Sequence, residues 1–240
     1  MTDKLPHVMT ADEWKAFIRA FNTKCPTGLR NAAIFTLMHD AGLRTCEVLA
    51  LKASDIRSDE LDGSQVTCLH LHRTKGDRER VVYLTPMAEL LLSRWLEVKR
   101  ERGLGRQQNV FTTLKGAPVK DAYLRELAAR KGRQAGSAWR VHPHALRHTF
   151  ATDLLEHTGD LALVQDALGH SNPQTTRVYP KVRNGRLAAA MMGRKRPKPA
   201  DGPATHAPDP VVAQALQAFA NLTPKQRAEL MALVQGKGGE

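Results

Sequence analysis

The chain has 240 residues, of which 42% are hydrophobic and 5% aromatic, and its formal net charge is +12. This length allows one large domain, or one domain with a small appendage, and the apolar content is enough for a core. The excess of Lys and Arg favours a polyanionic partner, because contacts with phosphates release bound counterions. No apolar run reaches the roughly 18 residues of a transmembrane helix, so no membrane span is expected.

Helices are predicted in the first fifty residues. Thr10 is typical of a helix N-cap and precedes acidic residues, which predicts a helix over residues 10–21. A second helix is expected over residues 26–39. Gly42 permits a sharp break in the backbone. A short helix over residues 44–51 then places Arg44 at its N-terminal end, where the free backbone N–H groups favour an anion.

A small antiparallel sheet is expected next. Its strands are predicted over residues 53–56, 65–72 and 80–84, the last of which is rich in β-forming residues. Between the last two strands, residues 74–79 contain a Gly-Asp pair that suits a hairpin turn. Lys75 lies in this turn, where a flexible side chain can enter a groove of a nucleic acid.

Two further helices are predicted over residues 86–100 and 119–133, on either side of a loop-rich segment in which Phe111 is the expected core anchor. Thr85 and Pro86 begin the first of them. Its apolar residues predict a buried stripe at Leu90, Leu91, Trp95 and Val98.

A helix starting at Pro143 carries an apolar face, made of Leu146, Phe150 and Leu154. His144 and Arg147 are three residues apart and therefore share an adjacent face near its N-terminus. Asp160 predicts the cap of a further helix that ends at Leu168, where Gly169 favours termination just before His170. A short segment after this helix carries Tyr179.

The composition changes near residue 193. Residues 194–210 are rich in Pro and begin with a basic cluster, which predicts a linker. Residues 211–240 form two short amphipathic patterns that are too small to fold alone, so a helical appendage is expected. The predicted organisation is therefore one main domain over residues 1–193, the linker, and the appendage.

The three cysteines, Cys25, Cys46 and Cys68, follow no metal-ligand spacing. Their odd number argues against a disulfide framework and suits a reducing cytoplasm. Cys46 and Cys68 are expected to be small core residues. The N-terminal residues contain no apolar run, so a signal peptide is not expected.

Six of the polar residues suit chemistry on a phosphodiester: Arg44, Lys75, His144, Arg147, His170 and Tyr179. Arginine offers a rigid fork of donors to phosphate oxygens. Histidine holds or moves a proton near neutral pH, and tyrosine can act as a covalent nucleophile. Glu47 is three residues after Arg44 and is interpreted as a partner that orients an arginine.

In this order, the six residues resemble the Arg…Lys…His-x-x-Arg…His/Trp…Tyr motif of the tyrosine recombinases, or phage-type integrases. The resemblance covers roughly residues 8–192. It implies the α+β, mainly helical fold of that family's catalytic domain, with a small antiparallel sheet. It also suggests a short member that lacks the N-terminal core-binding domain with which typical members clamp DNA. Pro180 after Tyr179 departs from the family, which has a small polar residue there.

The resemblance assigns a role to each residue. Tyr179 would attack the scissile phosphate and form a 3′-phosphotyrosyl link, while Arg44 and Arg147 hold the non-bridging oxygens. His144 would act as the base for the tyrosine, His170 as a donor to the phosphate and Lys75 as the acid for the leaving oxygen. No cofactor or metal is expected, because the covalent intermediate conserves the bond energy.

Several neighbours of these residues are interpreted as structural. Arg73, Arg78 and Arg80 lie near Lys75 and are taken as solvated charges. His148 is expected to point toward the interior. Of the remaining tyrosines, Tyr83 is expected in a strand and Tyr123 on a helix face.

The resemblance implies a site-specific recombinase or integrase, of the kind that mobile elements carry, acting on double-stranded DNA in the bacterial cytoplasm as a tetramer on paired sites. Two alternatives remain at this point: a type IB topoisomerase, which relaxes supercoils as a monomer, and a DNA-binding remnant of a mobile element that no longer cuts. Residues 184–192 are predicted to form a helix that either docks on a neighbouring protomer or packs on its own domain.

Overall fold

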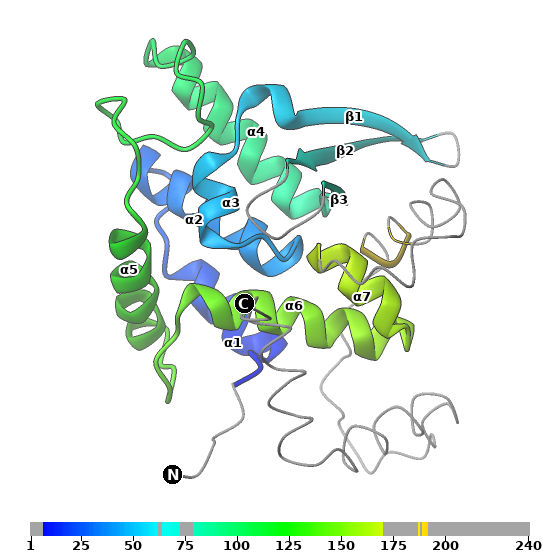
Figure 1. Ribbon diagram of the computed structural model, residues 1–240. Coiled ribbons are helices and arrows are strands. Elements are labelled where there is room, and N and C mark those ends of the chain that lie inside the picture. The colour runs from blue at the N-terminus through cyan, green and yellow to red at the C-terminus, as the bar shows by residue number, and fades with distance from the viewer. Residues whose placement is uncertain (1–6, 62–63, 73–78, 170–186, 188, 192–240) are drawn as a thin grey trace, which may run out of the picture.

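The computed structural model describes a helical body with a three-stranded sheet at one side and helix α5 at the opposite side (Figure 1). The residues that it describes are 7–61, 64–72, 79–169, 187 and 189–191. Within these ranges, no helix is both long and apolar enough to cross a membrane. The predicted fold class, mainly helical with a small antiparallel sheet, is confirmed.

The first helices form as their caps predict. Helix α1 (Ala11–Arg19) begins with a capping box, in which Thr10 and Glu13 each accept a hydrogen bond from the other's backbone N–H. Helix α2 (Pro26–Asp40) has no exposed polar face, since every residue from Leu29 to His39 is buried, and it packs against α4 and α6. It is therefore the central helix of the body, because a helix without a polar face must be covered on all sides.

A glycine turn leads from α2 to α3 (Thr45–Ala50). Gly42 has a φ of +65°, and a Cβ atom there would lie 2.4 Å from Cδ1 of Phe150. Both the backbone conformation and the close approach of the ring require glycine. This turn fixes where Arg44, the N-cap residue of α3, leaves the core.

The sheet consists of β1 (Ile56–Leu61), β2 (Ser64–Leu71) and β3 (Arg80–Tyr83), in the antiparallel order β1-β2-β3. The prediction of a strand over residues 53–56 was wrong. Ala53–Asp55 form a 3₁₀ turn, which Asp55 closes by accepting a hydrogen bond from the Lys52 N–H at 2.9 Å. The strand starts only at Ile56.

Strands β2 and β3 pair through Leu71 and Arg80, which agrees with the predicted hairpin. Apart from Glu79, the turn itself, including Lys75, lies outside the described residues.

Helix α4 (Pro86–Glu101) buries a slightly different face from the predicted one. Leu90 is 52% exposed, whereas Leu92 is buried together with Leu91 and Trp95. Lys99 continues this buried face. Its ammonium group donates to the carbonyl oxygens of Gln107 and Asn109, at 3.1 and 2.5 Å, and so holds the loop that follows the helix.

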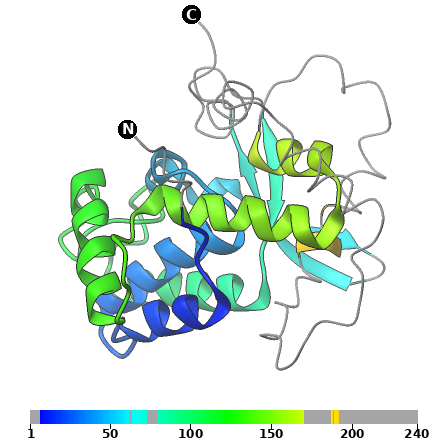
Figure 2. The same cartoon turned by 90° about the horizontal axis from the view of Figure 1, so that it is seen from below.

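The second half of the body contains α5 (Asp121–Gln134), α6 (Pro143–Thr158) and α7 (Leu161–Leu168). Figure 2 shows α6 crossing the molecule, with α5 near one end and α7 and the sheet near the other. The predicted core face of α6, which is Leu146, Phe150 and Leu154, is fully buried, as is the loop residue Phe111. Gly169 ends α7 in the left-handed conformation, with a φ of +77°.

The core extends to the end of the described chain. Leu187 and Met191 are helical and buried in the same hydrophobic core as α2 and α6. Residues 184–192 were predicted either to dock on a neighbouring protomer or to pack on their own domain. These two side chains pack on their own domain. The predicted linker (194–210) and appendage (211–240) lie outside the described residues.

Candidate active site

Arg44 is held at the start of α3 by Glu47. The backbone N–H of Arg44 donates to Oε2 of Glu47 at 2.7 Å, and its Nη1 lies 3.4 Å from Oε1. The Arg44 side chain is 20% exposed, whereas that of Glu47 is 4% exposed. Glu47 therefore orients the arginine, as the sequence predicts, and the Arg44 side chain remains partly exposed.

Arg147 lies in the second turn of α6 and is only 1% exposed. Its Nη1 donates to the carbonyl oxygen of Gly42 at 2.6 Å, and its Nη2 donates to that of Leu168 at 2.8 Å. Nη1 also lies 3.6 Å from Oε2 of Glu47. These acceptors offset the cost of burying the charge.

His144 lies one turn before Arg147, at the exposed N-terminal end of α6. The atoms crowded around its ring partly desolvate the imidazole, and this effect, with the charge of Arg147 and smaller contributions from other cations, lowers its pKa to about 4. The ring is therefore neutral near pH 7 and can accept a proton.

Two further histidines surround His144. His142 caps α6 by accepting a hydrogen bond from the Ala145 N–H, and its ring is stacked 6.5 Å from that of His144. His148 is partly buried, and burial lowers its pKa.

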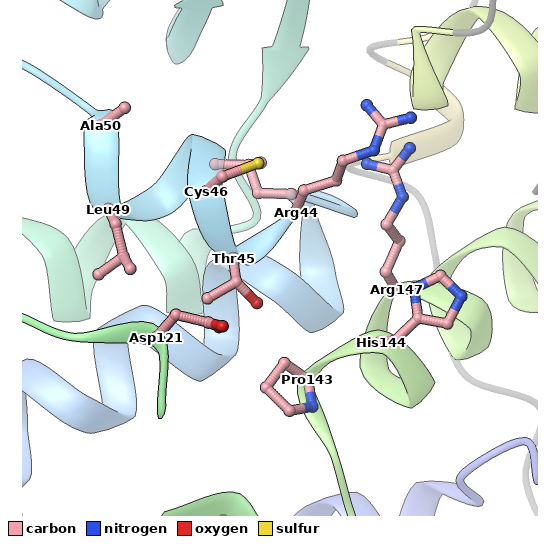
Figure 3. A pocket seen from close by; sticks show the side chains of 10 residues that line it. Arg44, Thr45, Cys46, Leu49, Ala50, Asp121, Pro143, His144 and Arg147 are labelled. Atoms are coloured by element: carbon pink, nitrogen blue, oxygen red, sulfur yellow. The ribbon is translucent and has the colours of Figure 1, made fainter. Parts of the chain in front are cut away.

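Arg44, His144 and Arg147 line one open cleft of about 650 Å³. Figure 3 shows the guanidinium groups of Arg44 and Arg147 extending into the same region, with His144 beside Arg147. Thr45, Cys46 and Asp121 complete part of the wall. Three of the six predicted site residues, which come from α3 and α6, therefore lie together around a concave surface that can receive a phosphate group.

Two features of this cleft differ from the sequence-based expectations. Cys46 is exposed, so the prediction that it is a core residue was wrong, although Cys68 is buried as expected. Cys46 lies on the open side of α3, where the short helix faces the cleft. Asp121, the first residue of α5, also lines the cleft, and no sequence pattern indicated that it would lie there.

The interpretation of Arg80 as a solvated charge was also wrong. Its side chain is 6% exposed and binds Glu47 through two hydrogen bonds of 2.7 and 2.8 Å. Burial by itself raises the pKa of Glu47, but Arg80, Arg147 and the Arg44 N–H together lower it, so the carboxylate is ionised. The two-residue period of β3 could have indicated this, because Arg80 shares a face with the buried Val82.

Lys75, His170 and Tyr179 lie outside the described residues. The chain has three tyrosines, and the structure describes the other two. Tyr83 is in β3 and buried, its hydroxyl donates to Asp59 at 3.0 Å, and its pKa is raised by burial and by that carboxylate. Tyr123 lies on α5, and its hydroxyl accepts a hydrogen bond from Asn31. Neither belongs to the cleft lining.

No group of three or more His, Cys, Asp or Glu side chains in the described part of the chain is arranged to hold a metal ion. Within that part, the polar chemistry of the cleft comes mainly from two guanidinium groups and an imidazole. These groups suit binding of an anion and transfer of a proton.

The sequence matches the phage integrase family model over residues 7–186, and the chain therefore belongs to this family. Its relatives are tyrosine recombinases. It is 38% identical over 176 residues to tyrosine recombinase XerC of Xylella fastidiosa strain 9a5c, and 37% identical over 188 residues to XerD of Lacticaseibacillus casei. These alignments cover 73% and 77% of this chain, but 56% and 61% of the relatives. The chain thus spans little more than half the length of these relatives.

Solved structures agree with the family. The XerH site-specific recombinase bound to its difH substrate matches with a TM-score of 0.60 and 30% identity, over 72% of this chain and 50% of that one. Lambda integrase residues 75–356 bound to DNA match with a TM-score of 0.53 and 18% identity, over 77% of this chain and 62% of that one, which shows the fold alone. The predicted tyrosine recombinase fold is confirmed.

Proposed function

We propose that this protein is a site-specific DNA recombinase that cleaves and rejoins DNA through a 3′-phosphotyrosyl intermediate. The observation that carries the proposal is the convergence of Arg44, Arg147 and the neutral His144 on one cleft. Family membership and the likeness to recombinases support it. The geometry suits a reaction in which negative charge grows on phosphate oxygens.

The chemistry follows from the positions of these residues. The guanidinium groups of Arg44 and Arg147 bind the two non-bridging oxygens and stabilise the charge that develops on them. His144 accepts the proton of the attacking tyrosine, which we assign to Tyr179, because a tyrosine of ordinary pKa near 10 is protonated at neutral pH. The other tyrosines are engaged in hydrogen bonds away from the cleft.

We assign the remaining roles to two residues outside the described ranges. His170 donates a hydrogen bond to the phosphate, and Lys75 protonates the 5′-oxygen as it leaves. Two described residues that lie near them in the sequence support this assignment. Arg80, which pairs with Leu71 at the base of the Lys75 turn, and Gly169, which precedes His170, are in contact with each other next to Glu47.

The partner that fits this site is double-stranded DNA in the bacterial cytoplasm. The related XerH and lambda integrase structures contain DNA, and the basic chain is suited to a polyanion. We further propose that protomers assemble as a tetramer on paired sites, and that the catalytic domain ends near residue 193.

Covalent trapping tests this function and identifies the target sequence in one experiment. Wild-type protein is incubated with a library of nicked duplexes whose sequence around the nick is randomised, and DNA that remains attached after denaturation is sequenced. Because cleavage next to the nick frees a short fragment that carries the 5′-hydroxyl, religation is blocked and the intermediate accumulates. We expect one enriched sequence, which the Tyr179→Phe variant does not trap.

The same sequence, placed once or twice in a supercoiled plasmid, separates the alternatives. Exchange that needs two copies supports a recombinase, whereas relaxation of a plasmid without the sequence supports a type IB topoisomerase. Binding without any trapped DNA would indicate a remnant that no longer cuts and would contradict the proposal.

A further inference from the structure

Arg80 binds Glu47, the carboxylate that also lies near Arg44 and Arg147. Arg80 itself is not among the residues that line the cleft. It begins β3 and forms two parallel hydrogen bonds with the carboxylate, from Nη1 to Oε1 at 2.7 Å and from Nη2 to Oε2 at 2.8 Å. Both side chains are almost completely buried. This is the strong bidentate geometry of an arginine–carboxylate pair.

Glu47 is shared by three guanidinium groups, but not equally. Arg80 makes the two short contacts, whereas Nη1 of Arg44 lies 3.4 Å and Nη1 of Arg147 lies 3.6 Å from the carboxylate. A charge-assisted N–H···O bond is about 2.7–2.9 Å long when the groups meet directly. The ion pairs of Arg44 and Arg147 with Glu47 are therefore longer than the one that Arg80 forms.

We propose that Arg80 is a positioning residue, which saturates the Glu47 carboxylate and so keeps Arg44 and Arg147 directed toward the phosphate. The proposal rests on the function proposed above, because it assigns the phosphate to these two arginines. Without Arg80, Glu47 becomes a buried carboxylate whose remaining cationic neighbours are Arg44 and Arg147 among the contacts described. Since an uncompensated buried charge is costly, these arginines would move toward it and away from the cleft.

Gly169 lies next to the guanidinium group of Arg80. A Cβ atom on Gly169 would lie 2.7 Å from Nη1 of Arg80, the nitrogen that binds Oε1 of Glu47. The absence of a side chain at the end of α7 therefore makes room for the guanidinium group. This contact couples the end of α7, next to His170, to the carboxylate that holds Arg44.

The test compares Arg80→Met, Glu47→Gln and the double variant. Each is assayed for single-turnover cleavage of DNA that carries the target sequence found by trapping. We expect Arg80→Met to slow cleavage by about 100-fold, because a displacement of about 1 Å has this effect on a positioned catalytic group. DNA affinity should change by less than about tenfold, since many phosphate contacts share it. The exposed Arg57→Met on β1 is the matched control and should cleave at the wild-type rate.

The double variant distinguishes positioning from a purely structural role. Glutamine carries no charge to attract Arg44 and Arg147, so Arg80→Met/Glu47→Gln should cleave at least about tenfold faster than Arg80→Met alone. If Arg80 only stabilises the fold, the double variant will be as slow as the single one or slower. That result, or wild-type cleavage by Arg80→Met, would overturn the proposal.

A second comparison leaves Arg80 chemically intact. Gly169→Ala should displace its guanidinium group and slow cleavage, whereas Gly136→Ala, with a similar φ of +79° and no atom near its added Cβ, should not. Equal rates for the two variants would contradict the role of Gly169.

Crystal structures of the wild type and of Arg80→Met give a readout that does not depend on activity. In the variant, we expect the Arg44 or Arg147 guanidinium to move from 3.4 or 3.6 Å to about 2.7–2.9 Å from the Glu47 carboxylate. Unchanged distances would refute the proposal even if the wild type cleaves DNA. Contraction in a protein that forms no adduct would instead sink the proposed function alone.

Discussion

Arg147 donates a hydrogen bond from Nη2 to the carbonyl oxygen of Leu168 at 2.8 Å, which joins the second arginine of the cleft to the end of α7. Its Nη1 donates to Gly42 at the turn before Arg44. One buried guanidinium group thus bridges the segment that leads to Arg44 and the segment that leads to His170. Its position depends on the packing of α2, α6 and α7 together.

Replacing Arg147 by Lys should separate catalysis from binding. Lysine keeps the charge but cannot span Gly42 and Leu168 while also offering a fork to the phosphate. We expect cleavage to fall by about 10²–10³-fold and DNA affinity to change much less. The free energy of unfolding should fall by about 1–3 kcal/mol, because a buried carbonyl loses its donor. Cleavage rates, DNA titration and urea unfolding measure these effects, and equal losses of cleavage and binding would mean that Arg147 only positions DNA.

Gly42→Ala should be strongly destabilising. Its φ of +65° costs an L-residue about 1–2 kcal/mol. The collision of the new methyl group with Phe150 adds about 1–3 kcal/mol of overpacking. Gly103→Ala is the control, because its φ is +70° but no atom lies within 4 Å of the added Cβ. Urea unfolding should show a clearly larger loss for Gly42→Ala; equal losses would show that the ring contact is unimportant.

The free energy of unfolding should depend on pH through His144. Partial desolvation of the ring and the charge of Arg147 lower its pKa to about 4, from an ordinary value of 6.5. Between these values the unfolded chain binds the proton and the folded protein does not, so the contribution of His144 to stability is complete above pH 6.5 and is lost as the pH falls toward 4.

For the same reason, the neutral base persists below pH 6.5 in the free enzyme. The second-order rate of adduct formation should therefore have its His144-dependent acid limb well below pH 6.5, and His144→Gln should remove that limb. A limb at pH 6.5 or above that depends on His144 would contradict the lowered pKa.

The boundary near residue 193 predicts different outcomes for two changes in the C-terminal region. Deleting residues 194–240 should leave the melting temperature and cleavage nearly unchanged, because the proposed domain ends before them. Leu187→Ala should reduce the free energy of unfolding by about 2–5 kcal/mol, since this side chain is buried in the core. Unfolding or complete loss of cleavage in the truncated protein would place the tail within the catalytic domain.

Much of the fold could be predicted because local signals and the tertiary structure agree. Thr10, Thr85 and Asp160 each cap a helix through the hydrogen bond that their residue types favour. The exceptions arise where packing decides between equivalent choices. Leu90 and Leu92 have the same side chain, and only the position of α4 on α2 determines which one is buried. Strand β1 is polar over most of its length and is defined by its pairing with β2.

The site also contains some residues that local sequence signals predict and others whose positions depend on packing. Arg44, His144 and Arg147 were predicted from motif spacing, and the structure brings them to one cleft. The period of β3 could have indicated that Arg80 faces inward with Val82, but not its partner, because a salt bridge between β3 and α3 depends on a tertiary contact. The exposure of Cys46 likewise depends on which side of the short helix α3 faces the cleft.

The central claim is that Tyr179 forms the covalent link to DNA, and peptide mapping of the trapped adduct tests it most directly. The adduct is digested with protease and nuclease, and the peptide that carries the nucleotide is identified by mass spectrometry. We expect the modified peptide to contain Tyr179, Tyr179→Phe to form no adduct while still binding DNA, and Tyr83→Phe to form adduct normally. An adduct that persists in Tyr179→Phe, or that maps to Tyr83 or Tyr123, would contradict the account.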